Sequence, residues 1–187
     1  MKTKFILHGG FDLKKTNSNN TDFYTEILKD APENAEILLV PFARETDTIP
    51  AATNKVIAEL NKIKKQHVIT INIAREDNFL EQVRPADVVY FHGGVSLKLL
   101  KTLRKYPDLR EFLKGKIVAG ESAGANVLCK FFFSPHADDV FEGLGIVPVK
   151  IIPHYKKEYE GRIDHVGADV ETLLLPEYTY KIFYQDL

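Results

Sequence analysis

The chain has 187 residues, 44% of them hydrophobic, and a formal net charge of −1 at pH 7; these values are ordinary for a globular protein with one good-sized core. Such a balanced charge argues against a nucleic-acid or membrane-surface role, because both need concentrated positive charge. Cys129 is the only cysteine, which excludes an intrachain disulfide and a cysteine-based metal cage. Without a signal peptide or an apolar stretch of membrane length, we expect a cytoplasmic protein with a single domain over residues 1–187.

Short apolar runs alternate with segments of helical periodicity through the first two thirds of the chain. The apolar runs predict strands at residues 4–8, 36–41, 68–73, 87–92 and 117–120. A first helix is predicted to begin at Thr21, and four more are predicted at residues 49–65, 78–84, 97–106 and 108–114. Residues 11–20 are expected to form a polar loop. Strands that alternate with helices predict an α/β fold, in which a mostly parallel sheet carries helices on both faces.

The pattern is less regular after Cys129. The aromatic run at residues 131–133 is followed by Ser134 and Pro135, which predicts a buried segment that gives way to an irregular loop. Further strands are expected at residues 147–153 and 173–175, and an edge strand at residues 178–183. A helix with weak periodicity is predicted over residues 158–169.

A five-residue motif, Gly120-Glu121-Ser122-Ala123-Gly124, separates a predicted strand from a predicted helix. It matches the G-x-S-x-G pattern of a nucleophile elbow, a sharp turn that holds a serine in a strained backbone conformation. The residues two before and two after the serine must be small, because larger ones would collide in so tight a turn. The turn also aims the first helical N–H groups at the space beside the hydroxyl. The alternative interpretation is a serine that only caps the helix.

A serine nucleophile needs a base, and the base needs a third group that holds its tautomer. His154 directly follows the predicted strand at residues 147–153, so it is expected at the carboxyl edge of the sheet, where Ser122 also lies and where ligands bind in folds of this type. His8 and His92 end predicted strands at the same edge and are candidates to line the site. His67 precedes a strand and is expected at the opposite edge.

Four segments together resemble the peptidase E family of serine peptidases, which includes the aspartyl dipeptidases and is similar to the cyanophycinases. They are residues 90–100, 120–126, 144–155 and 175–177. The most specific of them are the Ser-Ala-Gly-Ala-Asn segment that begins at Ser122 and the Pro-His pair at His154. The resemblance implies a three-layer, flavodoxin-like fold similar to that of class I glutamine amidotransferases, with a serine in place of their cysteine.

The resemblance also implies roles for individual residues. Ser122 matches the family nucleophile, His154 the base, and Glu177, within Leu-Pro-Glu, the acid that orients the histidine. The backbone N–H groups of Gly94 and Ala123 match the oxyanion hole. The resemblance implies no metal and no organic cofactor.

Several residues are weaker candidates for substrate binding. His92 and Gly93 stand in a segment, His92-Gly93-Gly94-Val95, where the family usually has three glycines and an asparagine. Arg162 is a candidate to pair with a substrate carboxylate, although an exposed helical arginine is the alternative interpretation. Asp138 or Asp139 is a candidate for an acidic residue that contributes in some relatives. Glu121 is expected to turn away from Ser122 and to support the site or form a buried ion pair.

The sequence therefore predicts a serine peptidase that cleaves a short peptide or amide bond through an acyl-enzyme, with a preference for an amino-terminal Asp resting on the resemblance and on Arg162. The expected partner is a small peptide substrate, with no nucleic acid and no membrane, and the chain is expected to be a monomer or a homodimer. One alternative is an α/β-hydrolase esterase in which Asp138 or Asp139 supplies the acid and His154 or His165 the base. The other is a non-catalytic binding member of the same family, which the altered glycine segment and the end of the chain ten residues after Glu177 keep open.

Overall fold

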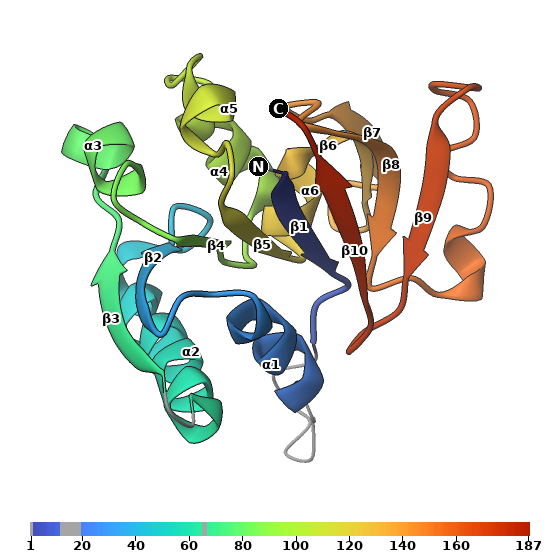
Figure 1. The fold of residues 1–187 in the computed structure, drawn as a ribbon. Helices are drawn as coiled ribbons and strands as arrows, with labels where there is room; N and C mark the ends of the chain where they lie inside the picture. The colour runs from blue at the N-terminus through green and yellow to red at the C-terminus, as the bar shows by residue number, and fades with distance from the viewer. Residues whose placement is uncertain (1, 12–19, 65–66) are drawn as a thin grey trace.

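A computed structural model describes residues 2–11, 20–64 and 67–187 (Figure 1). Its larger sheet has six strands in the order β10-β1-β5-β4-β2-β3. Neighbouring strands run parallel except for β10, which pairs antiparallel with β1. The strands are β1 (Thr3–His8), β2 (Asn34–Val40), β3 (Val68–Ile73), β4 (Val88–Phe91), β5 (Ile117–Glu121) and β10 (Tyr180–Gln185).

Helices cover both faces of this sheet, as expected for an α/β protein of three layers (Figure 1). Side chains alternate between the faces along each strand: in β1, Ile6 packs in the cluster that contains α1 and α2, whereas Phe5 and Leu7 pack in the cluster that contains α3 to α6. The helices are α1 (Thr21–Lys29), α2 (Ile49–Ile63), α3 (Phe79–Val83), α4 (Ser96–Leu103), α5 (Leu109–Phe112) and α6 (Ala123–Leu128), and short 3₁₀ turns lie at Thr46–Thr48, Glu76–Asn78 and Lys157–Tyr159.

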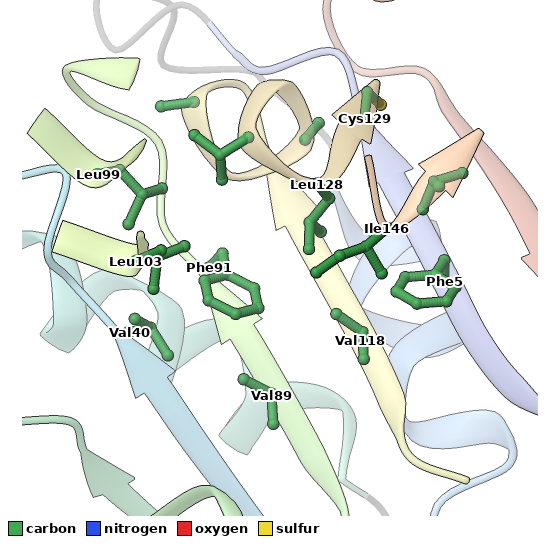
Figure 2. Packing of buried hydrophobic residues seen from close by; sticks show 14 of the residues in the cluster. Phe5, Val40, Val89, Phe91, Leu99, Leu103, Val118, Leu128, Cys129 and Ile146 are labelled. Atoms are coloured by element: carbon green, nitrogen blue, oxygen red, sulfur yellow. The ribbon is translucent and has the colours of Figure 1, made fainter. Parts of the chain in front are cut away.

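A second sheet of four strands, in the order β7-β6-β8-β9, lies beside α6 (Figure 1). Its strands are β6 (Cys129–Ser134), β7 (Asp139–Glu142), β8 (Val147–Pro153) and β9 (Glu171–Leu175). Leu128 of α6 and Ile146 before β8 pack against Phe5 and Val118 of the larger sheet (Figure 2). One apolar cluster therefore joins the two sheets. Its close packing holds β8 against the larger sheet, in which β5 leads to Ser122.

Two sequence predictions about this second sheet are wrong. The irregular loop expected after residue 133 is a β-hairpin, because β6 continues to Ser134 and pairs antiparallel with β7; its turn contains Asp138 at φ 51°, a conformation that Asp tolerates better than most residues. The helix expected over residues 158–169 is also absent. Only the 3₁₀ turn Lys157–Tyr159 forms there, and Gly161 and Gly167, with φ of 77° and 52°, interrupt any helical continuation.

The remaining predicted elements are confirmed, with shifts of a few residues at their ends. The predicted edge strand is β10, which begins at Tyr180. Two predictions reach beyond the described residues: most of the loop expected over residues 11–20 lies outside them, as does Lys65 at the end of the helix expected over residues 49–65. Among the residues that are described, no helix has both the length and the apolar character needed to cross a membrane.

Candidate active site

Ser122 stands at the tip of a strained turn between β5 and α6. Its φ of 50° and ψ of −104° lie outside the regions that residues with a Cβ normally occupy. The turn is held from both sides, because the Ser122 N–H donates to the carbonyl of His8 at 3.0 Å and the Ser122 carbonyl accepts from the Asn126 N–H at 2.9 Å. The hydroxyl makes no capping hydrogen bond to α6. The helix-cap interpretation is therefore wrong, and the turn has the geometry of a nucleophile elbow.

The glycines on either side of Ser122 are required by close backbone contacts. A Cβ on Gly120 would lie 2.7 Å from the backbone nitrogen of Ala125, and a Cβ on Gly124 would lie 2.2 Å from the carbonyl oxygen of Phe91. Both neighbours are backbone atoms, so they cannot rotate away. The two glycines allow α6 to start directly above the sheet, as the spacing of the motif predicts.

His154 links Ser122 to a carboxylate. Its Nε2 lies 2.9 Å from Ser122 Oγ, and its Nδ1 lies 3.1 Å from Glu177 Oε1. His154 follows the last residue of β8, while Glu177 lies in the connection from β9 to β10. The structure thus brings together, within hydrogen-bonding distance and in the expected order, three residues from three separate segments. Such a series can activate the hydroxyl, because the imidazole can accept its proton while the carboxylate holds the Nδ1–H tautomer.

The Gly9-Gly10 pair after β1 holds both partners of Ser122 in place. The Gly9 carbonyl accepts from the His154 N–H at 2.7 Å, and the Gly10 carbonyl accepts from the N–H of Tyr178, next to Glu177, at 2.9 Å. A Cβ on Gly10 would lie 2.3 Å from His154 Nε2, so only glycine leaves room for the ring. The role of this pair could not be predicted from the sequence, because it depends on contacts between distant segments.

A small cavity opens beside the Ser122 hydroxyl. It measures about 200 Å³ and is lined by Phe11, Arg44, Gly93, Gly94, Glu121, Ser122 and His154. Among the described residues, the backbone N–H groups of Gly94 and Ala123 have no hydrogen-bond acceptor. Gly94 also approaches the segment after β2 closely, since a Cβ there would lie 2.4 Å from the carbonyl oxygen of Ala43. These N–H groups are therefore available to a ligand oxygen, as an oxyanion hole requires.

A second cavity, of about 390 Å³, adjoins the first and shares Phe11, Arg44 and Glu121 with it. His92 and Lys55 line this larger cavity. The structure thus separates two of the predicted substrate-binding residues: Gly93 lines the small cavity at Ser122, whereas His92 lines the larger cavity next to it. The contribution of α2 through Lys55 was missed, because a lysine on an amphipathic helix is normally an exposed residue.

Glu121 faces both cavities from a buried position. Its side chain accepts a hydrogen bond at Oε2 from the Tyr90 hydroxyl at 2.5 Å, and the residue is 4% exposed. Burial raises the pKa of this carboxyl, although Tyr90, Arg44 and Lys55 oppose the shift. In the described part of the chain it forms no ion pair. Of the two alternatives for Glu121, the buried ion pair is wrong, and a hydrogen bond from Tyr90 is found instead. The expectation that its side chain turns away from the site is also wrong, because Glu121 lines the cavity at Ser122.

His8 and His92 are buried and neutral. His8 accepts a hydrogen bond at Nδ1 from the Gly10 N–H at 3.0 Å. Burial lowers the pKa of His8 to about 4, with a further contribution from His154, and burial together with Arg44 lowers the pKa of His92 to about 3. Both rings thus act as uncharged supports of the loops after β1 and β4.

These two shifts predict that the fold loses stability in mild acid. In the unfolded chain a histidine binds a proton below about pH 6.5, whereas in the fold His8 stays neutral down to about pH 4. The unfolded state then binds more protons, so the free energy of unfolding falls as the pH falls, by about 2 kcal/mol for each histidine between pH 7 and pH 5. Urea unfolding at the two pH values measures this loss.

The matched variants are His8→Asn, whose amide oxygen can replace Nδ1 as the acceptor for Gly10, and His136→Asn on the exposed hairpin turn. His8→Asn should remove about half of the combined pH-dependent loss, whereas His136→Asn should leave it unchanged. An identical pH dependence in His8→Asn and the unmodified protein would contradict the assignment.

Arg162, Asp138 and Asp139 lie elsewhere. They line a separate cavity with Phe133 and His165, which shares no residue with the cavity at Ser122. Arg162 donates to Asp138, so the structure does not bring this guanidinium or these carboxylates to Ser122. The acid that contacts His154 is Glu177, which follows the histidine in the chain. The alternative prediction of an α/β-hydrolase esterase, in which the acid precedes the histidine in the chain, is therefore wrong.

No group of three or more His, Cys, Asp or Glu side chains in the described ranges is placed to bind a metal ion. A three-layer α/β fold with serine, histidine and glutamate in series at a nucleophile elbow defines a serine hydrolase of the flavodoxin-like class. The family model of peptidase family S51 matches residues 5–172, and the chain belongs to this family. The matched range includes Ser122 and His154 and ends before Glu177. The protein is thus a serine peptidase of the peptidase E type, and its substrates are peptides.

Solved structures agree with this fold. A peptidase from an acI-B1 actinobacterium superimposes with a TM-score of 0.68 at 22% identity, covering 100% of this chain and 85% of the other. A protein from Listeria monocytogenes EGD-e, assigned to peptidase E, superimposes with a TM-score of 0.64 at 14% identity, with both chains covered completely. Among curated protein sequences, none matches the chain significantly.

Proposed function

We propose that the protein is a dipeptidase that hydrolyses short peptides through an acyl-enzyme on Ser122. The observation that carries this proposal is the series of short contacts from Ser122 Oγ to His154 Nε2, at 2.9 Å, and from His154 Nδ1 to Glu177 Oε1, at 3.1 Å. Ser122 attacks the scissile carbonyl carbon while His154 takes its proton at Nε2. Glu177 holds the ring in the tautomer that can accept this proton and stabilises the imidazolium that results.

The negative charge of the tetrahedral intermediate falls on the former carbonyl oxygen. The N–H groups of Gly94 and Ala123 donate to this oxygen, and the N-terminal end of α6 favours the charge. When the intermediate collapses, His154 returns the proton to the departing amine and leaves an ester on Ser122. Water then attacks this ester with His154 again as the base, which releases the acid and restores the hydroxyl.

The larger cavity is proposed to receive the side chain of the first substrate residue. It adjoins the nucleophile and carries the cationic groups of Arg44 and Lys55. Lys55 Nζ lies 4.2 Å above the ring of Phe11, and the buried Nε of Arg44 has no hydrogen-bond partner among the described residues. Two cationic side chains, one of which has an unpaired N–H donor, favour the binding of a carboxylate. A preference for an amino-terminal Asp is therefore better supported by Arg44 and Lys55 than by Arg162.

A panel of dipeptides tests the proposal. Each dipeptide has the same second residue, and the first is Asp, Glu, Asn, Gln or Ala. We expect hydrolysis of the panel, with kcat/KM for Asp at least about tenfold above that for Asn, since a charge-assisted hydrogen bond is worth about 1.5 kcal/mol or more. Arg44→Gln should reduce this ratio, whereas Arg110→Gln on the surface should not.

No hydrolysis of any dipeptide would contradict the proposed activity and favour a non-catalytic binding protein. Hydrolysis without an advantage for Asp would contradict only the proposed preference. We further propose that residues 1–187 act as one catalytic domain, because Ser122 follows the larger sheet and His154 follows the smaller one. The cytoplasmic location and the monomeric or homodimeric state stay predictions from the sequence.

A further inference from the structure

Glu121 is a buried carboxylate that lacks a cationic partner. Its Oε2 is occupied by the Tyr90 hydroxyl, and within the described ranges no Lys, Arg or His approaches it closely enough for an ion pair. A buried carboxylate without a countercharge is costly. Because Glu121 also lines both cavities beside the nucleophile, a positively charged ligand group can supply the missing partner.

The free carboxylate oxygen lies close to the nucleophile. A Cβ built on Gly93 would lie 2.7 Å from Glu121 Oε1 and 3.4 Å from Ser122 Cβ, so these two atoms are within about 6 Å of each other. Gly93 packs closely against both residues, and the open space beside them is the cavity of about 200 Å³ that Glu121 and Ser122 both line. Tyr90 occupies the other oxygen, and among the described residues Oε1 has no hydrogen-bond donor.

This spacing fits the amino end of a peptide. During attack the scissile carbonyl carbon lies about 3 Å from the serine oxygen. When the first residue of the substrate supplies this carbonyl, its α-nitrogen is two bonds away, at about 2.5 Å from the carbon. The nitrogen can then occupy the small cavity that Ser122 and Glu121 both line. In an internal residue the same nitrogen is an uncharged amide that continues into further chain.

We propose that Glu121 binds the α-ammonium group of the first substrate residue and thereby restricts cleavage to the bond after that residue. This inference rests on the proposed function, in which Ser122 is the nucleophile. The ammonium donates to Oε1, while the hydrogen bond from Tyr90 keeps the carboxylate oriented. A blocked or extended amino end places an uncharged, bulkier group against a buried carboxylate and is rejected.

Charges around the cavity are compatible with this role. Burial raises the pKa of Glu121, and Tyr90, Arg44 and Lys55 oppose this shift; Arg44 and Lys55 line the larger cavity. The first substrate residue then carries two charges that match the site, an ammonium toward Glu121 and an acidic side chain toward Arg44 and Lys55. The two contacts fix the residue on both sides of its α-carbon, which positions its carbonyl at Ser122.

The test compares three p-nitroanilides of the same first residue: one with a free amino group, one N-acetylated, and one in which hydrogen replaces the amino group. The unmodified protein should cleave the free amine with a kcat/KM at least about thirtyfold above that of the other two, which is the lower range for removing one partner of a buried charge pair. Similar values for all three substrates would overturn the inference without any need for a variant.

Glu121→Gln removes the charge but keeps the size and an acceptor for Tyr90. We expect it to lose at least about thirtyfold in kcat/KM on the free amine and to lose much less on the acetylated and hydrogen-substituted substrates, so that the ratio between the free amine and the other two falls toward one. Glu111→Gln, at an exposed position, is the matched control and should keep the full preference. If Glu121→Gln keeps the preference as well, the inference is wrong.

Labelling with a fluorophosphonate, which has no amino group, separates this inference from the proposed function. The unmodified protein and Glu121→Gln should both be labelled on Ser122. Labelling without any selectivity for the free amine overturns the role of Glu121 alone. If the unmodified protein is neither labelled nor able to cleave the three substrates, the proposed function is wrong and the inference falls with it.

Discussion

Replacement of Ser122 by alanine is expected to lower kcat for dipeptide hydrolysis by at least about a thousandfold, as removal of a nucleophile from a catalytic triad does. Alanine removes only the oxygen that lies 2.9 Å from His154 Nε2. Among the residues that the structure describes, no other hydroxyl lines the small cavity beside it, so none of them can take over the attack. The measurement is kcat for the unmodified protein and the variant at saturating substrate, together with fluorophosphonate labelling.

The variant should keep its fold, because the backbone at position 122 is set by neighbours. The bonds from the Ser122 N–H to His8 and from Asn126 to the Ser122 carbonyl are backbone bonds, and alanine keeps both. A thermal unfolding curve similar to that of the unmodified protein is therefore expected. Ser134→Ala, on the second sheet, is the control for loss of a serine hydroxyl. Equal hydrolysis by Ser122→Ala and Ser134→Ala would contradict the assignment of the nucleophile.

Much of this site could be predicted from sequence because its parts are local. Gly120 and Gly124 predict a tight turn, because the contacts that require glycine there come only from near neighbours in the sequence and from the adjacent strand. His154 and Glu177 follow β8 and β9 by one and two residues, and the carboxyl ends of these two parallel strands meet at one edge of the second sheet. Strand positions therefore predict His154 and Glu177 side by side, whereas the approach of Ser122, which follows a strand of the larger sheet, is predicted by the family resemblance.

The substrate side of the site was predicted poorly, because it depends on contacts between distant segments. Lys55 belongs to a helix whose polar face is indistinguishable in sequence from a solvated one, yet it lines the cavity that Arg44 and Glu121 share. Arg162 was chosen for its distance from His154 along the chain. Its position could not be inferred, because the sequence pattern predicts an irregular loop where the structure has the hairpin that carries Asp138, the partner of Arg162.

Replacement of Glu177 by glutamine should lower kcat by about a thousandfold and leave KM nearly unchanged. The carboxylate accepts from His154 Nδ1 and so directs the ring to present an unprotonated Nε2 to Ser122. A glutamine amide that donates to Nδ1 forces the opposite tautomer, which cannot take the serine proton; the corresponding change in a buried aspartate costs about 10⁴-fold. The Glu177 side chain is 29% exposed, so water replaces part of its effect and the expected loss is smaller.

Separate measurement of kcat and KM distinguishes this role from a structural one. An acid that acts through His154 affects the rate of bond formation to Ser122, so fluorophosphonate labelling should slow by a factor similar to that for kcat. A merely structural loss would instead lower the thermal stability and the fraction of labelled protein. Glu177→Asp, which keeps the charge on a shorter side chain, should recover part of the rate. A loss below about tenfold in Glu177→Gln would show that the histidine is oriented without the acid. The backbone hydrogen bond from His154 to Gly9 and the close approach of Gly10 to the ring would then be sufficient to hold it.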